Sequence, residues 1–357
     1  SNYYAYNTDF KFQRYGGFFQ LGKRALNNRM AISAGLRTDG NSFTLSGNDF
    51  LKTVSPRIGF SYVITDKINL NASVGRYYKL PQLTSLGFKT NNGEYANQDA
   101  KYIGSNHYVT GIEIIPSDAT RFTAEVFYKQ YVNSPISLQK GISLSNLGAD
   151  FNVLGNEAIT STGKGKSYGF ELFAQQKLTK RFFGVASYSY FRSSYTNNQG
   201  KYIASAWENI HLLSMTAGYK FNKNWELGIK FRLQGGNPYT PYDTAASRIN
   251  FLTLGTGVFD YTKLNTLRGK MFHSSDLRID KKYNFKKSSL DIFLDITNWY
   301  GSMSIAPSFY VFEAQANGQF KTTDGKPIQQ NGSNAIPTLF NNNSVFVTPT
   351  FGCIWEF

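Results

Sequence analysis

Three histidines and one cysteine are the side chains of this 357-residue chain best suited to metal binding or nucleophilic chemistry. His107, His211 and His273 lie far apart and lack the spacing of metal-ligand motifs. Cys353 is the only cysteine, which excludes an intramolecular disulfide and a multi-cysteine metal site. No Gly-rich phosphate loop is recognisable either. The sequence therefore predicts no metal site and no cofactor.

A serine hydrolase is the catalytic alternative that the residue types leave open. His211 precedes Leu212, Leu213 and Ser214, and Asp276 or Asp291 could supply a carboxylate. In an extended strand, however, His211 shares a face with Leu213 and not with Ser214. Nothing in this segment indicates an activated serine, so we expect no enzyme.

Apolar and polar residues alternate with a period of two, which indicates β-strands with one apolar face. The segment 225–234 shows it best, since its charged residues Glu226, Lys230 and Arg232 share one face. The other face is entirely apolar and comprises Trp225, Leu227, Ile229, Phe231 and Leu233. We expect the apolar face to contact lipid and the charged face to line a lumen.

Similar segments predict about thirteen strands, near 15–25, 30–38, 53–64, 68–79, 106–115, 121–131, 166–178, 181–195, 211–221, 225–235, 273–285, 289–300 and 344–357. Most have the roughly 9 to 11 residues that a tilted transmembrane strand requires. Short turns alternate with long Gly/Asn/Ser-rich connections near 80–105, 132–165, 236–272 and 301–343. This asymmetry favours an all-β transmembrane antiparallel barrel over a soluble sandwich or propeller.

Composition agrees with a strand-built membrane protein. The chain contains 24 Tyr and 30 Phe, and aromatic residues make up 16% of it. No apolar run approaches the roughly 20 residues of a membrane-spanning helix, so a bilayer would be crossed by strands. The formal charge of +15 could attract an anionic partner. Part of this charge lies in the proposed short turns, which contain Lys67, Lys180, Lys223, Lys286 and Lys287. The basic residues are scattered and no nucleic-acid module is recognisable, so no nucleic-acid partner is expected.

The C-terminal segment alternates in the same way and ends on an aromatic residue. Phe351, Trp355 and Phe357 are the aromatic groups of this segment, and Cys353 shares their apolar face. Outer-membrane barrels commonly end in this manner, because the terminal aromatic residue is read by the machinery that inserts them. We therefore expect these three residues to act as a barrel-insertion signal.

The chain resembles a TonB-dependent outer-membrane receptor of the kind common in Bacteroidetes. The resemblance lies in the segments 55–62, 75–81, 235–242 and 276–281 and in the terminal Phe357. It implies a barrel of about 22 strands around a plug domain. With thirteen predicted strands and no plug-like stretch, residues 1–357 are then expected to be the C-terminal portion of such a barrel. No separate soluble domain is expected, and the implied location is the outer membrane.

The resemblance implies active import of a scarce ligand, such as a siderophore-bound metal or a glycan, through the plug and the TonB complex. Other implied partners are outer-membrane lipid, lipopolysaccharide and the barrel-assembly machinery. A passive porin and a barrel enzyme are the alternatives. Ligand contacts are expected near the upper strand ends and in a loop, at Tyr77, Lys79, Arg232, Gln234, Tyr239 and Tyr242. For the tyrosines of this set, a position in the aromatic girdle at the membrane interface is the alternative.

Overall fold

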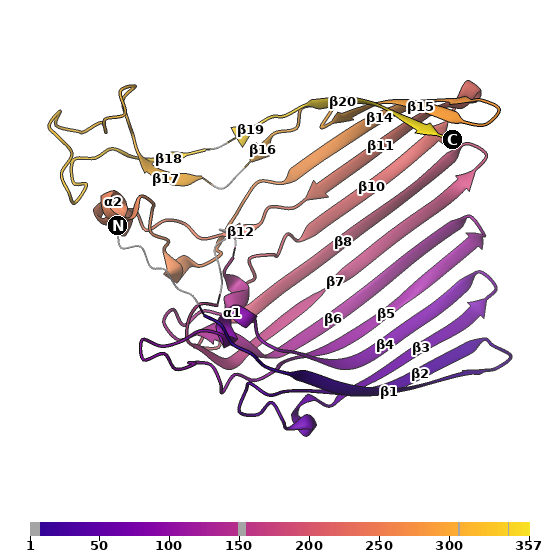
Figure 1. Cartoon of the computed structure of the whole chain (residues 1–357), viewed down its shortest axis with the longest axis horizontal. Coiled ribbons are helices and arrows are strands. Elements are labelled where there is room, and N and C mark those ends of the chain that lie inside the picture. Colours follow the sequence, from indigo (N-terminus) through magenta and orange to yellow (C-terminus); the bar gives the residue numbers. More distant parts are fainter. Residues whose placement is uncertain (1–7, 149–154, 306–307, 342) are drawn as a thin grey trace.

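A single antiparallel sheet dominates the computed structural model, which describes residues 8–148, 155–305, 308–341 and 343–357 (Figure 1). Thirteen of its strands pair with one another in chain order, and the short β9 (Tyr202–Ala204) is added beside β8. The thirteen are β1 (Arg14–Ala25), β2 (Met30–Asn41), β3 (Ser55–Thr65), β4 (Ile68–Lys79), β5 (Ile103–Ser117), β6 (Thr120–Ser137), β7 (Ile159–Thr179), β8 (Phe182–Thr196), β10 (His211–Lys220), β11 (Trp225–Gln234), β14 (Phe272–Asn284), β15 (Ser289–Thr297) and β20 (Thr348–Glu356).

Each of the thirteen predicted strands has a counterpart in this sheet, so the predicted all-β architecture is confirmed. The largest difference is in β6 and β7, which extend well beyond the predicted segments 121–131 and 166–178. Register shifts between Tyr131 and Ser134 and between Ser134 and Ile136 interrupt the regular pairing there. Such bulges break strict alternation, which is why the periodicity did not reveal the extensions.

The strand register confirms that apolar and charged positions lie on opposite faces of the sheet. Ile229 is directly opposite Ala217 and Leu277, whereas the neighbouring Lys230 is opposite Thr216 and Asp276. Side chains directly opposite one another on antiparallel strands project from the same face. The charged face of β11 is therefore continuous with polar faces on both neighbouring strands.

Large apolar side chains of the sheet are exposed, which inverts the arrangement of a soluble protein. Phe18 on β1 and Phe351 on β20 are each 75% exposed, and Val126 on β6 is 54% exposed. The buried hydrophobic residues of the described chain lie instead in the long connections or at the strand ends beside them. An apolar surface of this extent is stable only against another apolar phase, here lipid.

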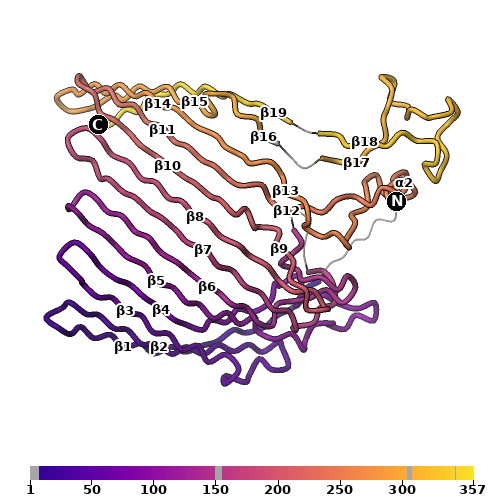
Figure 2. Tube along the Cα trace, turned by 180° about the vertical axis from the view of Figure 1, so that it is seen from behind, coloured from indigo at the N-terminus to yellow at the C-terminus, as the bar shows by residue number. Residues whose placement is uncertain are grey.

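Short turns and long connections lie at opposite ends of the strands (Figures 1 and 2). The short turns are 26–29, 66–67, 118–119, 180–181, 221–224 and 285–288, and they contain all five lysines that the sequence placed there. The long connections are 42–54, 80–102, 138–158, 197–210, 235–271 and 298–347, of which 149–154, 306–307 and 342 lie outside the described residues. The predicted asymmetry of the barrel is thus confirmed.

Helices and short strands occur only in the long connections and one turn of the described chain. Among the described residues, no helix is long and apolar enough to cross a membrane. These elements are α1 (Leu83–Leu86), α2 (Thr244–Leu254), η1 (Phe50–Thr53), η2 (Leu144–Asn146), η3 (Asn222–Asn224), η4 (Tyr261–Lys263), β12 (Pro238–Tyr239), β13 (Leu267–Arg268), β16 (Ser304–Ile305), β17 (Phe309–Phe312), β18 (Pro337–Phe340) and β19 (Asn343–Ser344).

The long connections form two hydrophobic cores of their own. The first loop core contains the buried Leu80, Leu86, Ala100, Tyr102, Ile142, Leu144, Leu147, Ile159 and Leu264. The second loop core contains Phe251, Tyr310, Phe312 and Ala335, with Tyr242 packed against it. Because buried apolar contacts favour one defined packing, these connections form a structured cap over the end of the sheet.

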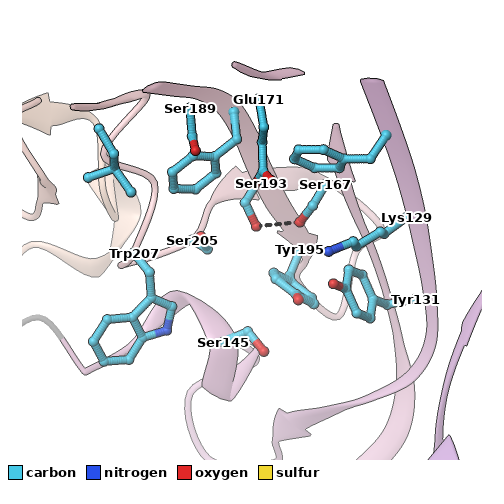
Figure 3. A pocket seen from close by; sticks show the side chains of 13 residues that line it. Lys129, Tyr131, Ser145, Ser167, Glu171, Ser189, Ser193, Tyr195, Ser205 and Trp207 are labelled. Carbon is cyan, nitrogen blue, oxygen red and sulfur yellow. Dashed lines mark hydrogen bonds between the residues drawn. The ribbon is translucent and has the colours of Figure 1, made fainter. Parts of the chain in front are cut away.

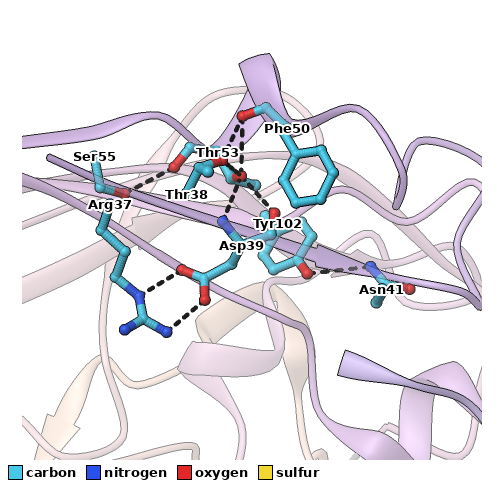
Figure 4. Close-up of polar contacts among 8 residues, drawn as sticks. All are labelled: Arg37, Thr38, Asp39, Asn41, Phe50, Thr53, Ser55 and Tyr102. Atoms are coloured by element: carbon cyan, nitrogen blue, oxygen red, sulfur yellow. Dashed lines mark hydrogen bonds and ion pairs between the residues drawn. The ribbon is translucent and has the colours of Figure 1, made fainter. Parts of the chain in front are cut away.

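Buried polar contacts fix the shortest of these connections, 42–54, to the ends of β2 and β3 (Figure 4). Thr53 is 1% exposed, and its Oγ1 accepts a hydrogen bond of 3.0 Å from the amide of Asp39. The Ser55 Oγ donates to the Thr53 carbonyl oxygen at 2.8 Å. Asn41, which is fully buried, donates from Nδ2 to the Tyr102 hydroxyl at 3.2 Å and so links this connection to the first loop core.

The last strand, β20, places the expected insertion-signal residues toward lipid. Phe351 and Trp355 are opposite Leu294 and Leu290 of β15, and Cys353 lies between them opposite Ile292. Phe357 follows the strand and is fully exposed. The role of these aromatic residues in insertion stays a prediction, because their position defines only the surface that they present.

We expect cysteine labelling along β11 to alternate with residue number. In a receptor carrying Cys353→Ser, single cysteines at 227, 229 and 231 should react with lipid-soluble maleimides and be protected from water-soluble ones. Cysteines at 226, 228 and 230 should show the reverse, since their register places them on the polar face. Accessibility repeating with a helical period would contradict the register.

Candidate ligand-binding site

Tyr77 lies on the polar face of β4, where this strand approaches the long connections. Its ring lies between the Arg57 guanidinium carbon, 4.3 Å from the ring centroid, and the His107 ring, 4.5 Å away between centroids. A Cβ on Gly75 would approach within 3.0 Å of the Tyr77 hydroxyl, so glycine makes room for this ring. Lys79 is two residues further along the same face. This packing presents an aromatic face and two cationic groups beside one another.

Arg232 and Gln234 lie on the polar face of β11 but are separated from Tyr77 by β5, β6, β7, β8 and β10. At about 4.8 Å between neighbouring strands, six steps along the sheet amount to about 29 Å. Arg232 forms an ion pair of 3.7 Å with Asp276, and Gln234 donates to Asn237 Oδ1 at 3.1 Å. The structure therefore places the predicted residues in two groups along the wall.

The two predicted loop tyrosines differ in their surroundings. Tyr239 is part of β12 and is opposite Leu267 of β13. Tyr242 stacks on Phe259, with ring centroids 4.8 Å apart, and contacts Tyr310 at 5.9 Å. Burial in this cluster raises the pKa of the Tyr242 phenol. Tyr242 thus contributes to the second loop core, which supports the shape of the loop.

A cavity of about 330 Å³ lies on the polar face of β6, β7 and β8, beneath the connections 138–158 and 197–210 (Figure 3). Tyr131 and Tyr195 form one side of it, with ring centroids 5.4 Å apart, and Trp207 lies on the other side (Figure 3). Lys129 lies beside the tyrosine pair, and Glu171 lies near Ser167 and Ser193 on the sheet wall (Figure 3). Lys129 is directly opposite His107 on β5, so this cavity continues the surface begun by Tyr77.

Several polar groups of this cavity form no ion pair or hydrogen bond among the described residues, although the Lys129 ammonium lies 4.9 Å from the centroid of the Phe127 ring. In the described part of the chain, neither Lys129 nor Glu171 takes part in an ion pair, and the Trp207 indole nitrogen has no hydrogen bond. The Ser205 Oγ is buried without a hydrogen-bond partner among the described residues. Ser167 and Ser193 bond to each other at 2.9 Å. Lys129 is partly exposed, and Glu171 and Trp207 are exposed, so these side chains are accessible to a ligand, whereas the Ser205 Oγ is closed off.

Glu208 holds the segment that carries Trp207. Its carboxylate is 2% exposed, forms ion pairs with Arg192 at 3.2 Å and with Arg268, and accepts a 2.7 Å hydrogen bond from the Ser193 amide. Arg268 also donates to the Glu208 carbonyl oxygen at 2.7 Å. The ordered connection fixes the position of the indole opposite the tyrosine pair.

Sequence reasoning missed this cavity because its residues come from six separate segments. Tyr131, Gly165 and Tyr195 are more than 25 residues apart and become neighbours only through the pairing of β6, β7 and β8. The one local signal is the serine-rich polar face of β8, which includes Ser187, Ser189 and Ser193. That signal indicates a polar, solvent-facing surface and does not specify a cavity.

The histidines have aromatic neighbours in the structure. The Nδ1 atoms of His211 and His273 lie 2.8 and 2.7 Å from the hydroxyls of Tyr188 and Tyr300. His211 is opposite Tyr190, whereas Ser214 is opposite Ser187 on the other face of the sheet. This register separates His211 from Ser214 and does not assemble a catalytic pair.

Comparison with protein families identifies the family to which this β-sheet belongs. The family model "TonB dependent receptor-like, beta-barrel" matches residues 1–298. The chain belongs to the TonB-dependent receptor family, whose members are outer-membrane β-barrel proteins of Gram-negative bacteria. The Bacteroidetes subtype stays a prediction. No curated protein sequence matches the chain.

Solved structures with similar folds are outer-membrane receptors. The siderophore receptor PiuA from Acinetobacter baumannii matches with a TM-score of 0.59 at 13% identity, over 97% of this chain and 43% of that one. The ferric-catecholate import receptor Fiu from E. coli K12 matches with 0.59 at 13%, over 96% and 45%. The pyoverdine receptor FpvA from Pseudomonas aeruginosa PAO1 matches with 0.58 at 16%, over 97% and 42%. The chain therefore spans less than half the length of these proteins, and the likeness establishes its fold.

Proposed function

We propose that the receptor containing this barrel wall binds a scarce nutrient at its loop end and imports it across the outer membrane with TonB-derived energy. Family membership supports the transport class. The observation that carries the binding role is the lumenal cavity, whose Lys129 and Glu171 side chains form no ion pair among the described residues. Unpaired charges on a wall that faces a transport path are suited to transient contact with a passing ligand.

The proposed partners follow from the two faces of the sheet. Outer-membrane lipid and lipopolysaccharide would cover the apolar face, and the barrel-assembly machinery would recognise the strand that carries Phe351, Trp355 and Phe357. A plug domain would contact the polar face and connect the receptor to the TonB complex. The nutrient ligand, a siderophore-bound metal or a glycan, would enter from the loop end, and nucleic acid is not a proposed partner.

We propose binding without catalysis, because the register places His211 and Ser214 on opposite faces of the sheet. A triad mechanism needs nucleophile and base within hydrogen-bond reach. Hydrolytic activity of the purified receptor that is lost in Ser214→Ala would contradict this proposal.

Uptake measurements in cells with and without TonB test the proposed transport class. Accumulation of a radiolabelled ferric siderophore or oligosaccharide should require the receptor, TonB and an energised inner membrane. Uptake that persists without TonB, together with swelling of proteoliposomes in permeant sugars, would instead identify a passive porin.

Replacing Tyr239 and Tyr242 together with alanine should weaken ligand binding by the complete receptor about tenfold. A Tyr239 contact of about 0.5 to 1.5 kcal/mol, together with the loosened packing on Phe259 and Tyr310 once the Tyr242 ring is removed, is sufficient for this change. The probe is the ligand that supports TonB-dependent uptake, and the measurement is equilibrium binding to receptor that is correctly inserted.

The matched control is the Lys223→Ala, Lys286→Ala double variant, which alters short turns at the opposite end of the strands. Its affinity should equal that of the unmodified receptor. Unchanged affinity in the tyrosine variant, with lower thermal stability, would assign both tyrosines to loop packing alone.

A further inference from the structure

The cavity between Trp207 and the Tyr131–Tyr195 pair has the shape of a slot with aromatic walls (Figure 3). Trp207 is 56% exposed and projects from the connection above, while the tyrosines belong to the strands below. Aromatic side chains offer flat apolar faces to the C–H groups of a ligand ring. A volume of about 330 Å³ lies near the lower end of the roughly 300 to 1,000 Å³ typical of ligand pockets. The slot therefore suits a short, ring-shaped part of a larger ligand.

The charge of the lining is balanced. Among the described residues that line it, Lys129 is the one cation and Glu171 the one acid, and Glu125, directly opposite Glu171, adds a second acid beside the lining. A ligand carrying several negative charges would need an excess of cations to compensate for its desolvation. A neutral ligand meets no such penalty, and its hydroxyls can bond to both an ammonium and a carboxylate.

Five serines add hydroxyl groups to the lining, and each can donate one hydrogen bond and accept two. The Ser205 Oγ is closed off from solvent, whereas the partly exposed Ser167 and Ser189 are among the hydroxyls of this lining that a ligand can reach. Ser189 is directly opposite Glu171, so a ligand hydroxyl can bond to both side chains.

We infer that this slot is a subsite for a neutral, hydroxyl-rich ring, namely a sugar unit of an uncharged oligosaccharide. The ring lies with its C–H face on Trp207, and its hydroxyls bond to Ser189, Lys129 and Glu171. The inference rests on the proposed import function and specifies the substrate class of its site. It differs from the siderophores named for the structural neighbours.

The test is binding of the complete, detergent-purified receptor to an array of neutral and acidic oligosaccharides, with ferrichrome and ferric enterobactin as further probes. Neutral oligosaccharides should bind. Trp207→Ala should weaken binding about tenfold or more, whereas Trp207→Phe should retain it within about threefold, because the aromatic face persists. Ser189→Ala should weaken binding about threefold to tenfold through its lost hydrogen bond.

Trp299→Phe and Trp299→Ala are the matched controls, because Trp299 is similarly exposed at 46% and donates from its indole to Ser275 Oγ at 3.1 Å, away from the slot. Both should bind like the unmodified receptor. Absence of neutral oligosaccharides among the ligands, or unchanged binding in Trp207→Ala, would overturn the subsite.

Uptake assays separate this inference from the proposed function. TonB-dependent uptake of a ferric siderophore that is unaffected by Trp207→Ala would retain the import function and refute the sugar subsite. Oligosaccharide binding that depends on Trp207, with uptake that does not need TonB, would retain the subsite and refute energised import.

Discussion

Replacing Glu208 with alanine should open the connection 197–210 by lowering its local stability about 3 to 5 kcal/mol. The change removes a carboxylate that is 2% exposed and leaves Arg192 and Arg268 without the ion pairs that they form with it. The Ser193 amide also loses its acceptor. Hydrogen exchange of the backbone amides of Ser193 and Ser205 in the complete receptor measures this local opening.

Glu226→Ala is the control for this prediction, because Glu226 is partly exposed in its ion pair of 3.4 Å with Lys220. Loss of an exposed pair costs about 0 to 1 kcal/mol. Glu208→Gln should lower the local stability by an amount between those of Glu208→Ala and Glu226→Ala, since the amide oxygen can still accept a hydrogen bond. Equal exchange rates in Glu208→Ala and the unmodified receptor would show that the connection does not depend on this carboxylate.

Val126→Lys should destabilise the inserted barrel by about 2 to 4 kcal/mol. Val126 is 54% exposed on the apolar face of β6, where Thr110 and Phe170 are its cross-strand neighbours. An ammonium group there must be buried in hydrocarbon or distort the bilayer to reach water. The free energy of unfolding from lipid vesicles and the fraction of heat-modifiable folded receptor are the measurements.

Thr123→Lys is the matched control on the same strand, because Thr123 lies on the polar face directly opposite Glu113. The new cation remains in the lumen beside a carboxylate, so its cost should be below about 1 kcal/mol. If both lysines were equally harmful, the assignment of the two faces of β6 would be wrong.

The strands were predictable because alternation is a local property of the chain. In β11, every second residue from Trp225 to Leu233 is apolar, and pairing with β10 and β14 preserves that order. In β6, the irregular pairing near Ser134 ended the pattern, so the last part of the strand was not recognised.

The candidate site was predicted only in part because it depends on pairing across strands. Tyr77 was identified from its place on the polar face of β4, and this face continues through His107 to the cavity. Trp207 lies in an irregular connection, where no periodicity indicates which way a side chain points. Tyr242 was expected to contact ligand from its place in a loop, while the structure shows it stacked on Phe259.

The connection between β11 and β14 is anchored in both loop cores. Near its end, Leu264 is buried in the first core, and Asn265 donates to the carbonyl oxygens of Asn146 and Ala204 at 2.7 and 2.8 Å. Near its middle, Phe251 of α2 is buried in the second core. Phe259 also stacks on Tyr242 beside the second core. Relative motion of the two cores must therefore strain the short stretch 260–263, which makes it the mechanical tether that limits how far the two cores can separate.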